Sequence, residues 1–125
     1  MSDEHPASPM RIAVAGASGR MGRMLTEAVR ASDKAELAAA LEREGHDWID
    51  RDLGEVTGGA PAGIRVISDV EAALAGADAL IDFTAPASTV EFSRHAAEAG
   101  VAHIIGTTGF SDEDLGALAL SLIHI

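Results

Sequence analysis

The feature that most constrains the fold of this chain is a glycine-rich turn near its start. Gly16, Gly19 and Gly22 directly follow an apolar run at residues 11–15, and residues 21–31 then carry apolar side chains at helical spacing. The order of strand, glycine turn and helix is typical of a βαβ unit that binds a dinucleotide. We expect Gly16 to permit the tight turn, Gly19 to let a pyrophosphate approach the backbone, and Gly22 to let the helix lie close on the sheet.

The rest of the chain alternates short apolar runs with helical patterns. Further strands are predicted at 37–41, 64–67, 79–83 and 101–105. Helices are predicted after a cap at 68 or 69 and ending at 76, at 88–99 and from 112, while 42–63 is predicted to be mainly loop. This alternation predicts an α/β fold, a Rossmann-type open parallel sheet with helices on both faces. We expect residues 10–120 to form this domain, 1–9 to be a flexible tail, and 121–125 to be an atypical tail, from truncation or added sequence.

Composition narrows the functional classes. A length of 125 residues with 47% hydrophobic residues predicts one domain, and a net charge of −11 makes nucleic acid an unfavourable partner. There is no cysteine, which excludes disulfides, thiolate metal sites and cysteine nucleophiles. Because the start has no apolar leader and no run is long enough to span a membrane, we expect a cytoplasmic protein without a membrane partner. The five histidines show no metal-ligand spacing, and we predict no metal site.

The second predicted strand ends at an acidic residue followed by a basic one. Glu42 stands twenty residues beyond Gly22, where a carboxylate can accept hydrogen bonds from the adenosine ribose hydroxyls. A carboxylate favours NAD, whereas the adjacent Arg43 can bind a 2′-phosphate and tolerate NADP. The pair predicts relaxed specificity. The alternative interpretation is a solvated run of charges over 42–44.

Small and hydroxyl residues follow the fourth and fifth predicted strands. Phe83 and Thr84 end the run at 81–84, and residues 105–110 read Ile-Gly-Thr-Thr-Gly-Phe. Ligands of open α/β sheets bind at the carboxyl ends of the strands, so these turns are candidates for the nicotinamide and its ribose. Each is also compatible with an ordinary turn. We expect Asp82, inside the strand, to cap loop N–H groups and not to act as a general base.

The motifs at 14–22, 39–45, 81–84 and 105–110, in this order and spacing, closely resemble dihydrodipicolinate reductases over residues 10 to about 118. The resemblance implies NADH or NADPH as cofactor and reduction of 4-hydroxy-tetrahydrodipicolinate in lysine and diaminopimelate synthesis. It also implies the site residues. The pyrophosphate would contact Gly16, Ala17, Ser18, Gly19, Arg20 and Met21. The adenosine ribose would contact Glu42, and a 2′-phosphate Arg43. The nicotinamide end would contact Gly106, Thr107 and Thr108, with Phe83 nearby.

The family's second domain, with its Glu-x-x-His-His-x-x-Lys motif, has no counterpart in this sequence. We therefore expect a chain that ends before the substrate and oligomerisation domain and supplies only the cofactor-binding half. We identify no catalytic residue in it, assign the small dicarboxylate substrate to a full-length enzyme, and expect a homo-oligomer. The main alternative is a nucleotide-sensing regulatory domain without catalysis. An atypical short-chain dehydrogenase would need a downstream tyrosine, and this chain has none.

Overall fold

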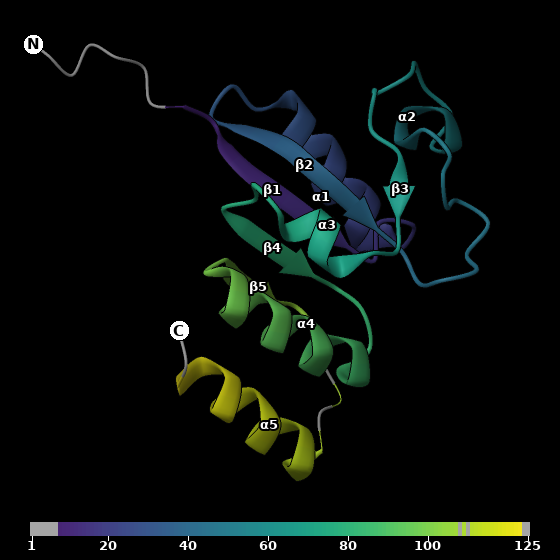
Figure 1. Ribbon diagram of the computed structural model, residues 1–125. Coiled ribbons are helices and arrows are strands. Elements are labelled where there is room, and N and C mark those ends of the chain that lie inside the picture. The colour runs from purple at the N-terminus through teal and green to yellow at the C-terminus, as the bar shows by residue number, and fades with distance from the viewer. Residues whose placement is uncertain (1–7, 108, 110, 124–125) are drawn as a thin grey trace, which may run out of the picture.

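The computed structural model describes residues 8–107, 109 and 111–123, with side chains up to residue 117. These residues form a five-stranded sheet with helices between the strands (Figure 1). In chain order the elements are β1 (Met10–Ala15), α1 (Arg20–Ala31), β2 (Ala35–Leu41), α2 (Leu53–Val56), β3 (Val66–Ile67), α3 (Val70–Leu74), β4 (Ala79–Asp82), α4 (Pro86–Ala99), β5 (Ala102–Ile105) and α5 (Asp112–Ile123).

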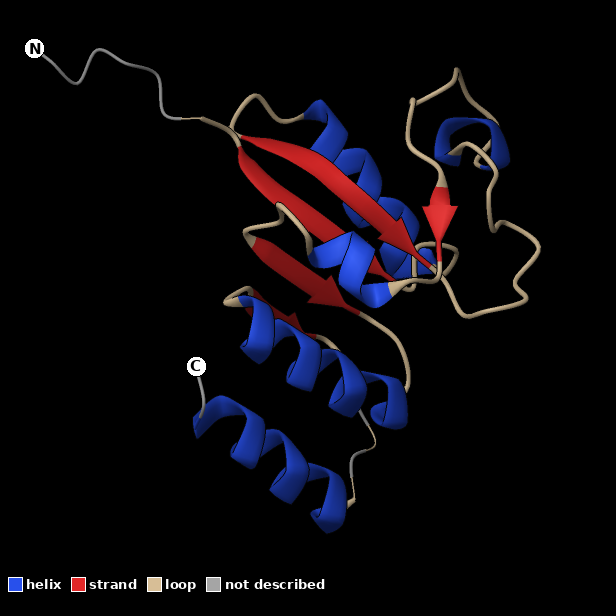
Figure 2. Cartoon of the chain, viewed as in Figure 1, coloured by secondary structure: helices blue, strands red, loops and turns tan. Residues whose placement is uncertain are grey.

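The α/β fold expected from the sequence is confirmed. The strands pair in the order β3-β2-β1-β4-β5 and every pairing is parallel. In Figure 2 the arrowheads of β1, β2 and β4 accordingly point to the same edge. The chain passes from one half of the sheet to the other between β3 and β4, so β1 and β4 lie side by side at the point where the strand order reverses. In sheets of this kind, ligands bind outside the carboxyl ends of the strands at that point.

Helices cover both faces of the sheet. One apolar cluster joins β1, β2 and β3 to α1 and α2 and includes Val14, Val29 and Leu53. The other joins β1, β2 and β4 to α3 and α4 and includes Leu41 and Leu74. Figure 1 shows α1 behind β1 and β2, and α3 and α4 in front, with α5 beside α4.

A register shift in β2 lets its side chains contribute to both apolar clusters. Ile12 pairs with Leu37 but Ala13 pairs with Ala39, so β2 has one extra residue, Ala38, at a bulge. A bulge reverses the side-chain alternation of a strand. As a result Leu37 packs on the α1 face, whereas Ala39 packs on the α3 and α4 face.

Three local differences from the sequence prediction have simple causes. Helix α4 begins at Pro86 instead of residue 88, because proline is favourable in the first turn, where its missing N–H costs nothing. The third strand is shorter than predicted because the backbones of Arg65 and Asp52 form an isolated antiparallel β-bridge, and the carbonyl oxygen of Ile64 accepts a hydrogen bond from Leu53 N–H. The predicted loop at 42–63 contains the short helix α2, which Asp52 caps by accepting from Glu55 N–H.

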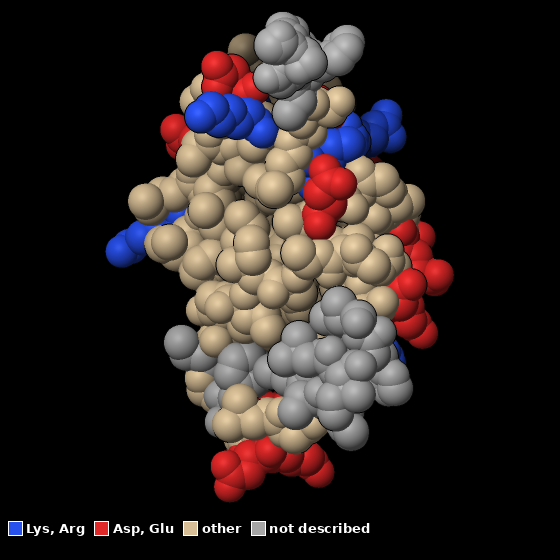
Figure 3. All heavy atoms as spheres, turned by 90° about the vertical axis from the view of Figure 1, so that its left-hand side faces the viewer, with Lys and Arg blue, Asp and Glu red and all other residues tan. Residues whose placement is uncertain are grey.

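On the side of the molecule where the strands begin, the described Lys and Arg side chains lie at separate places and form no broad basic area (Figure 3). Described acidic side chains lie along one margin of this view and at its lower end. Asp112, Glu113 and Asp114 form an acidic first turn in α5. None of the described helices is both long and apolar enough to cross a membrane.

Candidate functional site

The candidate site lies along the carboxyl edge of the sheet. Because the strands are parallel, the residues that follow β1, β2, β4 and β5 meet at one edge. Those residues are Gly16, Glu42, Phe83 and Gly106. The structure therefore brings together segments that lie up to ninety positions apart in the chain, as the sequence prediction required.

The glycine turn is held by close backbone contacts. Gly16 has a φ of +84°, and a Cβ added to it would lie 2.6 Å from the carbonyl oxygen of Phe83. A Cβ on Gly22 would lie 2.0 Å from the carbonyl oxygen of Gly16 and 2.9 Å from Ala17 Cα. The first glycine thus permits the tight turn, as expected. The third lets α1 approach the backbone of the turn itself, where the sequence prediction had placed it against the sheet.

The start of α1 is open for an anion. Gly19 is the N-cap residue and provides no side-chain cap, and the first turn of the helix contains no acidic residue. The unpaired N–H groups at a helix N-terminus carry partial positive charge and bind phosphate groups readily. An added Cβ on Gly19 would meet only the Gly16 carbonyl oxygen, at 3.5 Å. This end of α1 has the polarity and the space that a pyrophosphate needs.

Glu42 is tied to the glycine turn. Its Oε2 accepts hydrogen bonds from Ser18 N–H at 2.8 Å and from the Ser18 hydroxyl at 2.7 Å. The side chain is only 7% exposed, and its Oε1 lies 3.8 Å from His46 Nε2 and 3.4 Å from Arg43 N. His46 Nδ1 accepts from Trp48 N–H, so in the neutral ring the proton sits on Nε2 and faces Glu42. Glu42 therefore positions Ser18 with Oε2, while Oε1 accepts one long hydrogen bond from Arg43 N–H and can accept a further one from a ligand.

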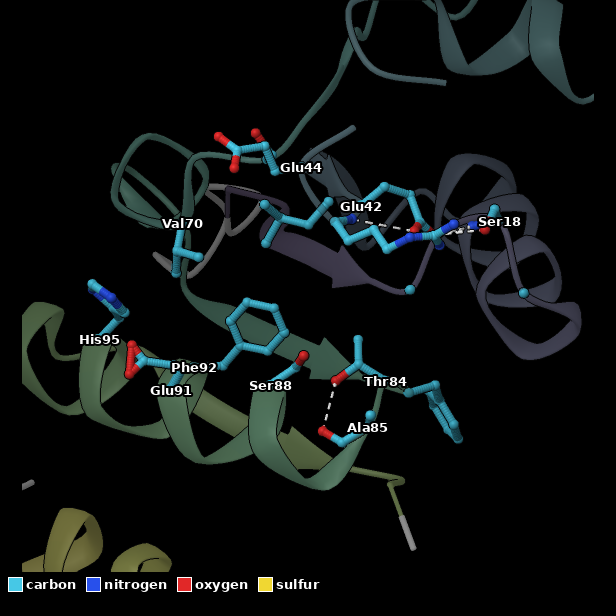
Figure 4. A pocket seen from close by; sticks show the side chains of 16 residues that line it. Ser18, Glu42, Glu44, Val70, Thr84, Ala85, Ser88, Glu91, Phe92 and His95 are labelled. Atoms are coloured by element: carbon cyan, nitrogen blue, oxygen red, sulfur yellow. Dashed lines mark hydrogen bonds between the residues drawn. The ribbon is translucent and has the colours of Figure 1, made fainter. Parts of the chain in front are cut away.

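The larger cavity of the site has a volume of about 490 Å³. It opens between the glycine turn, the end of β2, the start of α3 and one face of α4. Figure 4 shows Ser88 and Phe92 from α4 and Val70 from α3 around it, with Glu42 and Ser18 on the opposite side. The aromatic ring and the aliphatic side chain make this part of the cavity suitable for a flat, apolar group such as a purine base.

A second cavity of about 310 Å³ lies beside the first. It is lined by Gly19, Arg20, Met21, Gly22, Phe83, Thr84, Gly106 and Thr107. Gly19, Phe83 and Thr84 line both cavities, so the two form neighbouring parts of one site. A Cβ on Gly106 would lie 2.2 Å from Phe83 Cε1, which shows that the ring packs directly against the backbone after β5.

Asp82 organises the loops at this second cavity. Its Oδ1 accepts from Thr84 N–H at 3.0 Å and from the Thr84 hydroxyl at 2.6 Å, which confirms the expected capping role. Its Oδ2 lies 3.0 Å from His103 Nε2. Burial raises the pKa of Asp82, but hydrogen bonds from His103 and Thr84 outweigh it, and the pKa lies below its ordinary value. Asp82 is therefore a carboxylate near neutral pH.

The predicted site residues mostly lie around the two cavities. Gly16, Ser18, Gly19, Glu42, Arg43 and Phe83 line the larger one, and Arg20, Met21, Gly106 and Thr107 line the smaller. Ala17 is fully buried and lines neither. Thr108 lies outside the described residues. The predicted contacts with a cofactor stay predictions, because no ligand is present.

Two groups of residues were missed from the sequence. The first is the cavity-facing side of α4, where Ser88, Phe92 and His95 recur at helical spacing. That period could have marked them, but only once it was known which face meets the sheet edge. The second is His103, for which the sequence analysis assigned no chemistry. No group of three or more described histidine or acidic side chains is arranged to hold a metal ion.

Comparison with known proteins identifies similar sequences. Residues 10–122 match the family model described as dihydrodipicolinate reductase, N-terminus. A 4-hydroxy-tetrahydrodipicolinate reductase from Roseobacter denitrificans is 50% identical over 111 residues, which cover 89% of this chain and 41% of the relative. One from Ruegeria sp. strain TM1040 is 56% identical over 107 residues, 86% of this chain and 40% of the relative. The chain thus spans about two fifths of the length of these curated relatives.

Solved structures show the same fold. A dipicolinate-bound dihydrodipicolinate reductase from Paenisporosarcina sp. TG-14 superposes with a TM-score of 0.66 at 25% identity, covering 91% of this chain and 43% of the other. A UDP-N-acetylglucosamine 3-dehydrogenase from Acidithiobacillus ferrooxidans gives a TM-score of 0.68 at 25% identity, covering 93% and 34%. A myo-inositol 2-dehydrogenase from Lactobacillus plantarum gives 0.69 at 17% identity, covering 93% and 33%, a likeness of fold alone.

Proposed function

Since the chain belongs to the dihydrodipicolinate reductase family, whose N-terminal part it matches over residues 10–122, we propose that it binds NADH or NADPH along the carboxyl edge of its sheet. It supplies the cofactor-binding half of a reductase acting on 4-hydroxy-tetrahydrodipicolinate, the substrate in the names of its relatives. The observation that carries the proposal is the uncapped start of α1 next to two adjoining cavities. The pathway is lysine and diaminopimelate synthesis, and the location is the cytoplasm.

The phosphate groups bind at the glycine turn. The residues fit such a group, because the start of α1 has no side-chain cap, no acidic residue and open space at Gly19. The Arg20 and Met21 N–H groups and the positive end of the helix dipole neutralise part of the phosphate charge. These N–H groups and the helix dipole attract phosphate locally, although the chain as a whole has a net charge of −11.

The adenosine half occupies the larger cavity. Val70 and Phe92 provide its apolar walls, and Glu42 Oε1 accepts a hydrogen bond from the ribose. Arg43 lines the same cavity and is the candidate partner of a 2′-phosphate, whereas the carboxylates of Glu42 and Glu44 repel such a phosphate. This mixture of charges supports the relaxed choice between NADH and NADPH that the sequence predicted.

The nicotinamide end occupies the smaller cavity, beside Phe83, Gly106 and Thr107. When bound, the reduced cofactor supplies the hydride for reduction of the substrate. The residues of this chain bind and orient it and exclude water from one side. The described residues around the smaller cavity include no acid, and the basic Arg20 stands at the phosphate end, so the described lining of this cavity offers no candidate proton donor for the substrate. We propose that the 125-residue chain alone turns over no substrate.

Calorimetric titration with NADH and NADPH tests the binding proposal. The informative variant is Gly19→Asp, because Gly19 has ordinary extended dihedrals and an aspartate is a favoured N-cap. The variant should fold at least as stably as the parent, yet place a carboxylate where the phosphates bind. We expect a loss of affinity of about tenfold or more for both cofactors.

The matched control is Gly59→Asp, which adds the same charge at an exposed position whose added Cβ meets only the Gly54 carbonyl oxygen, at 3.8 Å. It should leave both affinities unchanged. A folded parent chain that binds neither cofactor at millimolar concentration would rule out the assigned site. Reductase turnover by the highly purified chain would contradict the proposal that it lacks a proton donor, and leave the binding proposal intact.

A further inference from the structure

A histidine and a carboxylate are buried together between β4 and β5, next to the smaller cavity. His103 Nε2 lies 3.0 Å from Asp82 Oδ2, and the two side chains are 2% and 0% exposed. Neither residue lines either cavity of the site. None of the contacts proposed above for the cofactor involves them.

Stability alone does not account for this pair. Moving a carboxylate and its polar partner from water into a protein interior is costly, and well-packed apolar residues of similar volume often stabilise a fold as well or better. Asp82 nevertheless remains a carboxylate, since its pKa is held below the ordinary value despite burial. A buried carboxylate of this kind needs donors at both oxygens, and His103 is the donor to Oδ2.

The imidazole ring of His103 is directed at Asp82 alone. Its Nδ1 is buried and has no hydrogen-bond partner within the described part of the chain. Because Asp82 is ionised, the Nε2 atom facing it carries the proton. The ring therefore orients one oxygen of Asp82 and leaves the other oxygen, Oδ1, for the loops.

The other oxygen of Asp82 joins the two loops at the smaller cavity. Oδ1 accepts from Thr84 N–H and hydroxyl, and from the Thr107 hydroxyl at 3.4 Å. The Thr107 oxygen in turn accepts from Thr84 N–H at 3.1 Å and from the Thr89 hydroxyl at 2.8 Å. The loop after β4, the loop after β5 and helix α4 thus meet in one polar network centred on Asp82.

We propose that His103 is a positioning residue that, through Asp82, holds the loops after β4 and β5 in the arrangement that receives the nicotinamide half of the dinucleotide. The inference rests on the proposed cofactor site. It assigns to His103 and Asp82 an effect mainly on the nicotinamide end of that site, because Thr107 lines the smaller cavity alone and the hydrogen bonds of the network join it to Thr84, which lines both cavities.

The test compares two ligands on the full 125-residue chain. ADP carries the adenosine and two phosphates, whereas NADH also carries the nicotinamide half. His103→Leu removes the donor and leaves an apolar side chain of similar size. We expect this variant to lower the affinity for NADH roughly tenfold and to change the affinity for ADP by less than about twofold. A tenfold loss is at the low end of what removing a hydrogen bond to a charged group costs. His103→Gln retains an N–H donor and should restore most of the NADH affinity.

Two further variants separate positioning from stability. Val101→Ala shortens a buried side chain in the same core, 2% exposed and outside the polar network, so it lowers the melting temperature while leaving the ratio of NADH to ADP affinity unchanged. Thr89→Val is nearly isosteric and removes the donor to Thr107 together with the 3.4 Å contact between the Thr89 and Thr84 hydroxyl groups. This variant should reproduce part of the selective loss of affinity for NADH, and it provides the test if His103→Leu does not fold.

The outcomes distinguish this inference from the proposed function. Binding of neither ligand by the parent chain overturns both. A parent chain that binds NADH no more tightly than ADP, or variants that weaken the two ligands equally, leaves the cofactor site in place and overturns the positioning role. A His103→Gln variant as impaired as His103→Leu also overturns it.

Discussion

Alanine at position 22 should destabilise the protein, although alanine is normally the better helix former. Gly22 lies in the first turn of α1, and an added Cβ would lie 2.0 Å from the Gly16 carbonyl oxygen and 2.8 Å from its carbon. Real Cβ atoms essentially never approach a heavy atom within 3.0 Å. The helix and the turn would therefore have to separate by about 1 Å, a shift that a close-packed interior resists.

The magnitude follows from two opposing effects. Glycine to alanine inside a helix gains about 1 kcal/mol from propensity. Overpacking a rigid region costs about 1–3 kcal/mol, and the upper end applies here because the obstructing atoms belong to the backbone. We expect a net loss of about 2 kcal/mol, which in a domain of this size lowers the melting temperature by roughly 8 °C.

The internal control is the same substitution in α5. Gly116 has no heavy atom within 4 Å of an added Cβ, so Gly116→Ala should gain up to about 1 kcal/mol from propensity. Urea unfolding followed by the fluorescence of Trp48, the only tryptophan, measures both variants. A Gly22→Ala protein as stable as the parent, or the same sign of effect at both positions, would refute the close approach of α1 to the turn.

Three further predictions concern charge and association. Arg43→Ala should lower the affinity for NADPH about 10- to 150-fold and leave the affinity for NADH almost unchanged. Glu42→Ala should lower the affinity for NADH more than that for NADPH. Equal losses of affinity for the two cofactors in calorimetry would exclude these roles. The pKa of Asp82 is lower in the folded state than its ordinary value of 3.8, so its stabilisation is present above that value and lost as pH falls through the folded pKa. Urea unfolding between pH 2.5 and 6 should show this slope, reduced in Asp82→Asn. We also expect self-association, because Ile104 on the edge strand β5 and Leu115 on α5 are 54% and 53% exposed, and a stable monomer in light scattering at high concentration would contradict it.

Much of the site could be predicted because its chemistry depends on residues close together in sequence. The turn from Gly16 to Gly22 carries its own signal, since only glycine tolerates a φ of +84° next to a neighbouring backbone. The acidic residue ending β2 could be placed by its spacing from that turn. The division into tails and a domain at 10–120 stays a prediction.

The remainder depended on packing between distant segments. Nothing in the spacing of Ser18 and Glu42 indicates that one carboxylate oxygen accepts twice from the serine, which changes how much of Glu42 is free for a ligand. The bulge at Ala38 has no local signal either, because it arises from the register against β1. Such features are set by which backbone groups meet, and sequence periodicity does not encode that.

The sequence by itself determined the α/β class, the glycine turn and the edge of the sheet at which we propose that the cofactor binds, because each follows from local propensity and from the direction of parallel strands. Only the tertiary structure decided that α4 forms a wall of the larger cavity, and that His103 and Asp82 are buried together. His103 and Asp82 stand on different strands, and an isolated histidine in a strand has no local partner to mark it. Their pairing depends on the register between β4 and β5, and the low dielectric of the interior then makes that single contact decisive for both side chains.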